Sequence, residues 1–479
     1  MRGLPCRRLA RPGAAPVTHF ASPKCTARAA SKPSCCAPFT ILKLVVALGL
    51  LVLCASQAVS RVVLDGNGSL PAIFRAATRR GGGRHHHHHE GNDAATKRML
   101  KVILSDATRG GQDFSDVVGG DVCEPCSNAS LSQLRPRAFI IGAQKGGTTA
   151  LMSYLAAHPA IVSPLNEPHV LNTKHDREAR ERGVQTIPQC ALFDLYRRWY
   201  DEQGVLPQVR DGGLMYIDKD PKNLIHSDVV PRRLLCADAN AKVVVVLRNP
   251  VDRAYSAFNM NMQRLEEGRD VWTALVPRAL AAPLVRLGRA LGIVPNFERA
   301  ASVEREIMRA SGILDASASP AEEARAFARL GEEGGWYGRN GYLIRGLYHV
   351  QLVQWLAAFR DHFGPKEVMN HILIMESEAN RRDKQGSYDR VLTFLDLPPH
   401  DLGDGGGSVD ALNIVAPDTA HNAENSRVYE HAMSAATRRD LEAFFRPHNA
   451  RLHELLSPLG VEISWAKQAY LELREQGAR

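Results

Sequence analysis

A glycine-rich turn that holds one lysine and two threonines is the first stretch of the sequence whose residue types could do chemistry. The turn lies within FIIGAQKGGTTALMSYLAAHP, residues 139–159, after a short apolar run and before a helical pattern. Glycines let backbone amides approach an anion, and a helix N-terminus adds partial positive charge. The lysine contributes a formal charge, and the threonines contribute hydroxyl donors. The turn is therefore predicted to bind a phosphate-like group through Lys145, Gly146, Gly147, Thr148 and Thr149.

The order of residues in this turn argues against a nucleotide-hydrolysing loop. Kinases and nucleotide hydrolases carry G-x-x-x-x-G-K-[ST], in which the lysine stands directly before the hydroxyl residue. Here Lys145 precedes the glycines instead. A tight strand-to-helix turn without a ligand is the plain alternative.

A second set of anion-binding side chains follows in VLRNPVDRAYSAF, residues 246–258. A strand pattern ends at Arg248, and Ser256 stands eight residues later. We expect Ser256 on the first turn of the next helix, where its hydroxyl and the guanidinium can converge on one phosphate. The alternative is that Arg248 is a solvated charge at the end of a strand.

Together the two segments resemble the phosphosulfate-binding loop and the 3'-phosphate signature of the sulfotransferases. These enzymes use 3'-phosphoadenosine 5'-phosphosulfate (PAPS) as donor. The resemblance implies that the turn at Lys145 binds the phosphosulfate group, and that Arg248 and Ser256 bind the 3'-phosphate. It covers about residues 135–460 and implies no required metal.

Two shorter segments are similar to the membrane-anchored, glycan-modifying branch of this family. The branch comprises the heparan sulfate 3-O-sulfotransferases and the sulfotransferase domain of the heparan sulfate N-deacetylase/N-sulfotransferases. NEPHVLN, residues 166–172, resembles the segment that carries their catalytic glutamate and a histidine, and Glu167 lies 22 residues after Lys145, as in that branch. YIDKDP, residues 216–221, matches the branch's lysine at Lys219.

The resemblance implies four roles in the transfer of a sulfuryl group to a hydroxyl or amine of a glycan. Glu167 is expected to remove the acceptor proton as general base. Lys145 is expected to neutralise charge on the bridging oxygen of the donor. Lys219 would assist at the sulfuryl group or the acceptor, and His169 would orient Glu167 or the acceptor. The alternatives are a solvated loop carboxylate at Glu167, a surface lysine at Lys219 and a structural histidine at His169.

The sequence also departs from that branch. Val170 and Leu171 stand where the heparan enzymes have paired phenylalanines, and Asp218 and Asp220 replace Glu and Thr around Lys219. These differences leave the acceptor open. A plastid or other organellar sulfotransferase with a non-glycan acceptor, and a non-catalytic protein that binds a nucleotide or a glycan, remain alternatives.

Short apolar runs alternating with helical patterns must position these residues. The runs at residues 138–142, 215–217, 242–247 and 371–375 are typical of strands buried on both faces of a parallel sheet. Helical spacing follows at residues 346–359 and 436–456. We therefore predict an α/β fold with a P-loop-like, mainly parallel sheet flanked by helices, and a ligand crevice at the carboxyl ends of the strands. This sulfotransferase domain is predicted to span residues 135–466, with a tail at 467–479. The stretch at 267–335 is longer than in the resembling enzymes.

The charge of the chain is concentrated at its N-terminus. The formal net charge is +9, and residues 1–64 hold nine basic residues and no acidic one. The rest of the chain is therefore near neutral, and no nucleic-acid partner is expected.

The same N-terminal block contains the apolar run LVVALGLLVLCASQAV from Leu44 to Val59. With its flanks, residues 39–60, it is about long enough to cross a bilayer. The basic tail at residues 1–38 favours a signal anchor that keeps the N-terminus cytosolic, typical of a type II Golgi membrane protein. A cleaved signal peptide and a plastid transit peptide are the alternatives.

Residues 61–134 read as a flexible, low-complexity stem. They contain the sequons Asn67-Gly-Ser69 and Asn128-Ala-Ser130, which predict a glycoprotein, and five consecutive histidines at 85–89, which we interpret as linker. No metal site is predicted, and neither His421 nor His448 is given a catalytic role.

Four cysteines lie beyond the apolar run, at positions 123, 126, 190 and 236. An even number in a luminal domain permits disulfides, although unpaired thiols remain possible and the pairing is open. A redox-active CEPC motif is disfavoured because no strand-then-helix pattern surrounds it.

Overall fold

The computed structural model of the chain describes residues 123–162, 166–184, 187–211, 214–268, 278–290, 294, 296–314, 320–332, 341–403 and 433–477. The predicted anchor at 39–60, the sequon at Asn67 and the five histidines lie outside these residues. Within the described ranges, no helix is long and apolar enough to span a membrane.

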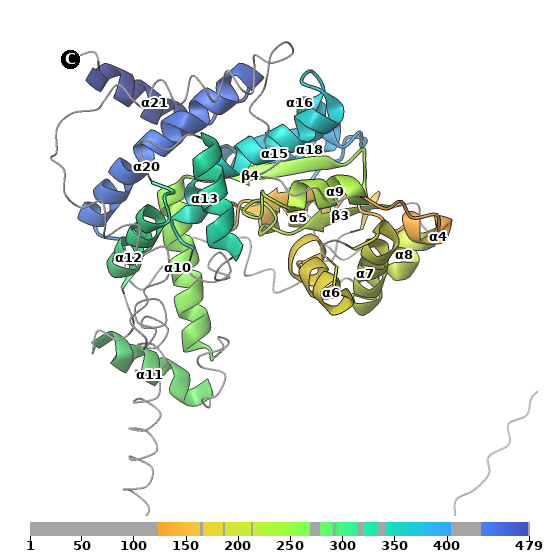
Figure 1. The fold of residues 1–479 in the computed structure, drawn as a ribbon, viewed down its shortest axis with the longest axis horizontal. Coiled ribbons are helices and arrows are strands. Elements are labelled where there is room, and N and C mark those ends of the chain that lie inside the picture. Colours follow the sequence, from red (N-terminus) through yellow and green to blue (C-terminus); the bar gives the residue numbers. More distant parts are fainter. Residues whose placement is uncertain are drawn as a thin grey trace, which may run out of the picture. The chain divides into compact units, whose positions relative to one another are not determined.

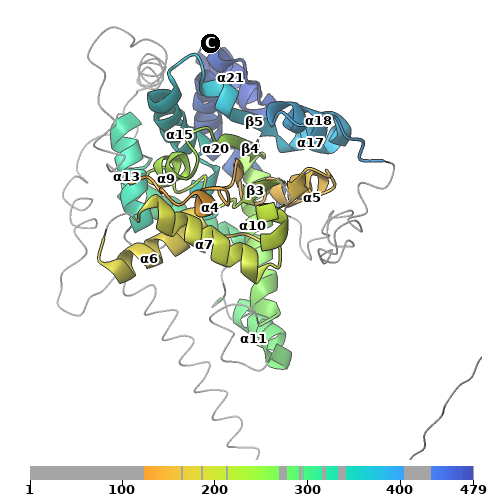
Figure 2. The same cartoon turned by 90° about the vertical axis from the view of Figure 1, so that its right-hand side faces the viewer.

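Five parallel strands form a sheet in the order β2-β3-β1-β4-β5. Helices surround this sheet (Figure 1 and Figure 2). The strands are β1 (Ala138–Gly142), β2 (Ile161–Val162), β3 (Met215–Lys219), β4 (Lys242–Leu247) and β5 (Ile372–Glu376). The predicted parallel α/β architecture is confirmed. β2 was not foreseen because two residues are too short to give a periodic signal.

Alternate residues of each strand face opposite layers of helices. On one side, Ile140 and Val244 pack against α5 (Thr148–Leu155) and α18 (Lys384–Phe394). On the other side, Phe139, Val243 and Val245 belong to a core cluster with α7 (Gln189–Glu202), α9 (Val230–Ala237) and α15 (Tyr348–Phe363). Because both faces are covered, the strands read as continuous apolar runs, as the sequence analysis assumed.

The remaining helices lie around and beyond these layers (Figure 1 and Figure 2). Long helices are α10 (Pro250–Glu266), α12 (Phe297–Ala310), α20 (Ala435–Leu456) and α21 (Ser464–Gly477). The others are α4 (Ala129–Ser132), α6 (His175–Arg182), α8 (Leu206–Asp211), α11 (Arg278–Ala290), α13 (Pro320–Glu332), α16 (Val368–His371) and α17 (Ser377–Arg382), with a π-helix at Val170–Lys174 and 3-10 turns at Ile344–Gly346 and Ser457–Leu459.

The C-terminal helix continues beyond residue 466, where the sequence predicts the domain to end. α21 packs along α20 (Figure 1), with Ala466 and Ala469 buried. Arg446 and Glu472 form an ion pair of 3.0 Å between the two helices. Part of the predicted tail is therefore a packed helix up to Gly477.

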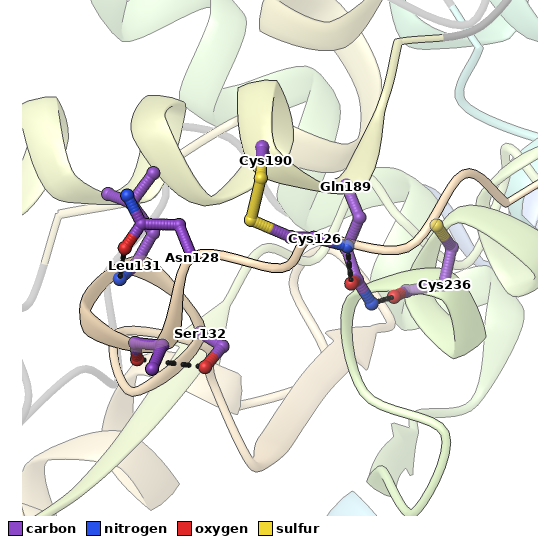
Figure 3. Close-up of a disulfide and its surroundings, with 8 residues drawn as sticks. Cys126, Asn128, Leu131, Ser132, Gln189, Cys190 and Cys236 are labelled. Carbon is purple, nitrogen blue, oxygen red and sulfur yellow. Dashed lines mark hydrogen bonds between the residues drawn. A yellow bond between two sulfur atoms is a disulfide. The ribbon is translucent and has the colours of Figure 1, made fainter.

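Two disulfides settle the pairing that the sequence leaves open. Cys123 bonds to Cys236. Cys126 bonds to Cys190, as Figure 3 shows. The two cysteines of CEPC are thus joined to distant partners and not to each other. Gln189 links the two bridges, because it accepts a hydrogen bond from the Cys126 amide at 2.8 Å and donates one to the Cys236 carbonyl at 2.5 Å. Residues 123–134, which the sequence analysis assigns to the stem, are therefore linked covalently to the folded domain.

Candidate functional site

The side chains singled out in the sequence lie where parallel strands end at one edge of the sheet. The glycine turn follows β1, Lys219 is the last residue of β3, and Arg248 follows β4 directly. The order of the strands reverses between β1 and β4, which is where α/β sheets open a ligand crevice. Sequence and topology therefore agree on the position of the site.

The turn after β1 is folded tightly onto β4. The Ala143 amide donates to the Val246 carbonyl at 2.8 Å, and a Cβ on Gly146 would lie 2.4 Å from that same oxygen. Gly147 has a φ of 99° and caps the start of α5. Gly146 leaves no room for a side chain, and the left-handed backbone of Gly147 is strained for other residues. The first turn of α5 leaves backbone N–H groups without helical acceptors.

The polar residues of this turn differ in exposure. Lys145 is half-buried and adopts a left-handed φ of 67°, a conformation that is uncommon outside glycine. Thr148 is buried, whereas Thr149 is exposed. Strained backbone of this kind is typical of a ligand-binding loop.

Arg248 connects the second predicted anion site to the first. Its Nη1 donates to the Lys145 carbonyl at 3.3 Å, and its own carbonyl accepts from the Tyr348 hydroxyl at 2.9 Å. Ser256 is buried and lies on α10, but as the seventh residue of that helix. The prediction of its first turn was wrong, because Asn249 caps the helix and α10 begins at Pro250.

Glu167 lies between a lysine and a histidine. Its Oε1 is 3.6 Å from Lys219 Nζ, and its Oε2 is 3.7 Å from His169 Nε2. The Lys219 side chain is only 4% exposed, against 33% for Glu167. The structure therefore brings together the three residues that the sequence analysis assigned to the acceptor side, and Lys219 is not a surface lysine.

Asp220 is a member of this group that sequence reasoning noted only as a departure from the family. Its Oδ2 accepts from His169 Nδ1 and from Asn172 Nδ2, each at 2.8 Å. Burial would raise the pKa of Asp220, but these contacts and the Lys222 amide lower it, so the carboxylate is ionised at neutral pH. The pattern DKDP gave no hint of this, because the contact depends on the π-helix that begins after His169 and turns Asn172 inward.

The pKa of Asp218, which precedes Lys219 in the sequence, is shifted in the opposite direction to that of Asp220. Burial and the charge of Asp220 raise the pKa of Asp218 to about 8, although a 2.7 Å hydrogen bond from the Tyr196 hydroxyl and the charge of Lys219 oppose the shift. Asp218 is thus largely protonated at neutral pH, and Asp220 is not. The two aspartates that flank one lysine hold different charges.

Arg345 is a second residue that the sequence analysis did not single out. It is buried, and burial together with Arg253 lowers its pKa to about 10, while Glu304, Asp220 and Glu167 oppose that shift. Arg345 therefore stays charged at neutral pH, and the negative charge of Glu167 contributes to its electrostatic environment. The only signal in the sequence was an arginine inside the apolar segment at 341–347.

Two groups of side chains could hold a metal ion among the residues that the structure describes. Glu167, His169 and Asp220 form one group, and Glu323, His349 and His448 form the other. The first belongs to the site described above.

Comparison with known proteins finds similarity to sulfotransferases. The profile of the sulfotransferase family matches residues 136–286, which include the turn at Lys145, Glu167, Lys219 and Arg248. Mouse heparan sulfate glucosamine 3-O-sulfotransferase 6 is 31% identical over 129 residues, covering 27% of this chain and 31% of that protein. Mouse bifunctional heparan sulfate N-deacetylase/N-sulfotransferase 4 is 24% identical over 358 residues, covering 71% of this chain and 32% of its own.

The chain spans about a third of the length of these curated relatives. A solved sulfotransferase from Alicyclobacillus acidocaldarius aligns with 70% of this chain and 99% of its own, at 22% identity and a TM-score of 0.39. Over residues 136–286, about a third of its length, the chain is similar to the sulfotransferase family.

Proposed function

We propose that the protein transfers a sulfuryl group from PAPS to a hydroxyl or amine of a glycan by in-line displacement. The observation that carries this proposal is the contact between the two anion-binding segments, in which Arg248 donates to the Lys145 carbonyl at 3.3 Å. A donor with a phosphosulfate and a separate 3'-phosphate needs cationic groups at two neighbouring points. A nucleotide without the 3'-phosphate would leave one of them unused.

The residues of the crevice suit such a donor. Gly146, Gly147 and the first turn of α5 offer a close approach of backbone amides to the phosphosulfate, with Lys145, Thr148 and Thr149 beside them. Arg248 and Ser256 would bind the 3'-phosphate through a guanidinium and a hydroxyl.

Transfer breaks the bond between sulfur and the bridging oxygen of the donor and forms a bond from sulfur to the acceptor oxygen or nitrogen. Glu167 takes the acceptor proton, and 3'-phosphoadenosine 5'-phosphate leaves. Lys145 neutralises the charge that grows on the bridging oxygen. Lys219, buried 3.6 Å from Glu167, faces the sulfuryl group or the acceptor.

Asp220 and His169 position the base in this scheme. Ionised Asp220 contacts His169 Nδ1 at 2.8 Å and fixes the orientation of the ring, whose Nε2 lies 3.7 Å from the Glu167 carboxylate. Orientation by a fixed partner lowers the reorganisation needed during transfer.

The proposed cellular setting is the Golgi lumen. The chain would begin with a cytosolic tail at 1–38, an anchor at 39–60 and a stem, followed by the sulfotransferase domain. Disulfides between Cys123 and Cys236 and between Cys126 and Cys190 support an oxidising compartment. The names of the heparan sulfate relatives support a glycan acceptor. A plastid enzyme with a non-glycan acceptor is the alternative that the acid-free N-terminal block favours.

Nucleotide-dependent stabilisation tests the donor half of the proposal. 3'-Phosphoadenosine 5'-phosphate should raise the melting temperature without added metal, because a ligand that binds only the native state stabilises it by about 2.7 kcal/mol at 100 times its dissociation constant. Adenosine 5'-phosphate should do much less, and Arg248→Ala should remove the difference between them. Equal shifts of the melting temperature with both nucleotides would contradict a 3'-phosphate site.

Transfer of radiolabelled sulfate to a panel of glycans, peptides and phenols then identifies the acceptor.

A further inference from the structure

Three helices bring one carboxylate and two imidazoles together inside the domain, apart from the residues assigned to sulfuryl transfer. Glu323 comes from α13, His349 from α15 and His448 from α20. One ligand atom of each lies within 4.8 Å of the other two. All three side chains are buried, and His349 is 0% exposed.

The two imidazoles of this cluster are not fully hydrogen-bonded. His349 Nε2 lies 3.5 Å from Glu323 Oε2, but neither ring nitrogen of His349 has a hydrogen-bond partner among the described residues, and neither does His448 Nδ1. Buried polar atoms in proteins are nearly always paired. The cluster therefore calls for a ligand that the three side chains share.

A metal ion satisfies this requirement. Zinc binds imidazole nitrogen and carboxylate oxygen at about 2.0–2.2 Å in tetrahedral sites, which puts neighbouring ligand atoms roughly 3.3 Å apart. The 3.5 Å between His349 and Glu323 is already close to that edge length. The stacked rings of His349 and His448, with centroids 5.3 Å apart, place the third ligand beside them.

We propose that Glu323, His349 and His448 form a structural zinc site in which water or the second carboxylate oxygen completes the coordination. Two imidazoles and one carboxylate are ligands that zinc prefers.

The electrostatics of the cluster are consistent with this assignment. Burial lowers the pKa of His349, and burial together with His349 lowers that of His448 to about 3. Both rings are therefore neutral, which is the form that binds metals. Arg451 Nη1 lies 3.4 Å from the same Glu323 Oε2, at the edge of the cluster.

The site would fasten α13 to the centre of the domain. α13 belongs to the stretch at 267–335 that is longer than in the resembling enzymes, whereas α15 and α20 pack on each other. A shared ion links the added helix to both. Metal removal should therefore loosen α13 first.

The test uses the full chain with His85 to His89 replaced by serine, so that the histidine run cannot bind metal. After dialysis against a weak chelator, elemental analysis should find one zinc per chain. Glu323→Gln and His448→Gln should each lower occupancy at least tenfold. Glu167→Gln removes a member of the other candidate group and should retain the zinc.

Cobalt substitution keeps the proposal testable even where those variants fail to fold. Cobalt(II) added to the metal-free, serine-substituted chain should give visible absorption bands of a tetrahedral nitrogen and oxygen site, and zinc but not magnesium should raise the melting temperature. Retention of zinc by both folded variants, or absence of the cobalt bands and of bound zinc in the parent chain, would overturn the assignment.

Discussion

Glu167 is flanked by groups whose charges decide how it can act. Lys219 Nζ and His169 Nε2 lie 3.6 and 3.7 Å from its two oxygens. The other ring nitrogen of His169, Nδ1, lies 2.8 Å from Asp220 Oδ2. The chain of contacts makes Asp220 a positioning residue in the proposed mechanism. Its effect on the reaction should pass through His169 and not through the donor.

Asp220→Asn tests that role. Loss of a hydrogen bond to a charged partner, about 1.5–3 kcal/mol, corresponds to roughly 10- to 100-fold in turnover. Turnover should fall by that factor while the affinity for 3'-phosphoadenosine 5'-phosphate stays constant. Asp176→Asn, which also changes an aspartate beside a histidine, should leave turnover unchanged. Equal losses of donor affinity and turnover in Asp220→Asn would show a merely structural role.

Asp218 should make the stability of the domain depend on pH. Its pKa is about 8 in the folded protein against the ordinary value of 3.8, so the folded state binds the extra proton between these values. The stability that protonation confers is full below about pH 4 and is lost as the pH rises through 8. Asp218→Asn cannot ionise, so its free energy of unfolding relative to the native chain should increase by a few kcal/mol between pH 5 and pH 8.

Denaturant unfolding of both proteins at the two pH values measures this difference. A constant difference across the range would mean that Asp218 is ionised throughout.

At the scale of elements, the strands and the glycine turn could be predicted because they follow local rules. The runs at 138–142 and 242–247 are apolar on both faces, and they became β1 and β4 with the same bounds. The π-helix at Val170–Lys174 and the Asp220 contact could not be predicted, because they depend on how distant segments pack. Ser256 was placed a turn too early because the sequence does not show where Asn249 caps α10.

The glycine turn offers a prediction with a matched control. Gly147 has a φ of 99° and Gly183 one of 67°, and each lies at the end of a helix. Alanine at either position should lower stability by about 1–2 kcal/mol, since left-handed backbone is strained for other residues. Only Gly147→Ala should also weaken nucleotide binding, as isothermal titration would measure. An unchanged affinity in a folded Gly147→Ala protein would argue against the turn as the phosphosulfate site.

At the scale of the whole molecule, the proposed compartment rests on the disulfides together with the N-terminal segments. The even number of cysteines after the apolar run permits disulfides, but the sequence does not predict their pairing. Cys123 and Cys236 are 113 residues apart and meet only in the folded domain. The acceptor could not be predicted at all, since no short motif encodes the shape of an acceptor site.

Glycosylation of Asn128 would test whether the protein passes through the secretory pathway. Its side chain is exposed and its Oδ1 accepts from the Leu131 amide at 3.2 Å, so the amide nitrogen is open to modification. In a secretory host, a glycan-cleaving enzyme should lower the mass of the protein, and Asn128→Gln together with Asn67→Gln should abolish that change. Import into plastids with loss of the N-terminal block would contradict the Golgi assignment.

The central claim is that Glu167 is the base for sulfuryl transfer at this edge of the sheet, and turnover of Glu167→Gln on a confirmed acceptor tests it most directly. Glutamine keeps the size of the side chain but cannot take a proton at neutral pH. With radiolabelled PAPS, turnover should fall by roughly 10²- to 10⁴-fold, the usual contribution of a positioned base, while affinity for 3'-phosphoadenosine 5'-phosphate is retained. Near-normal turnover of the folded variant would contradict the account and direct attention to His169 or Asp218.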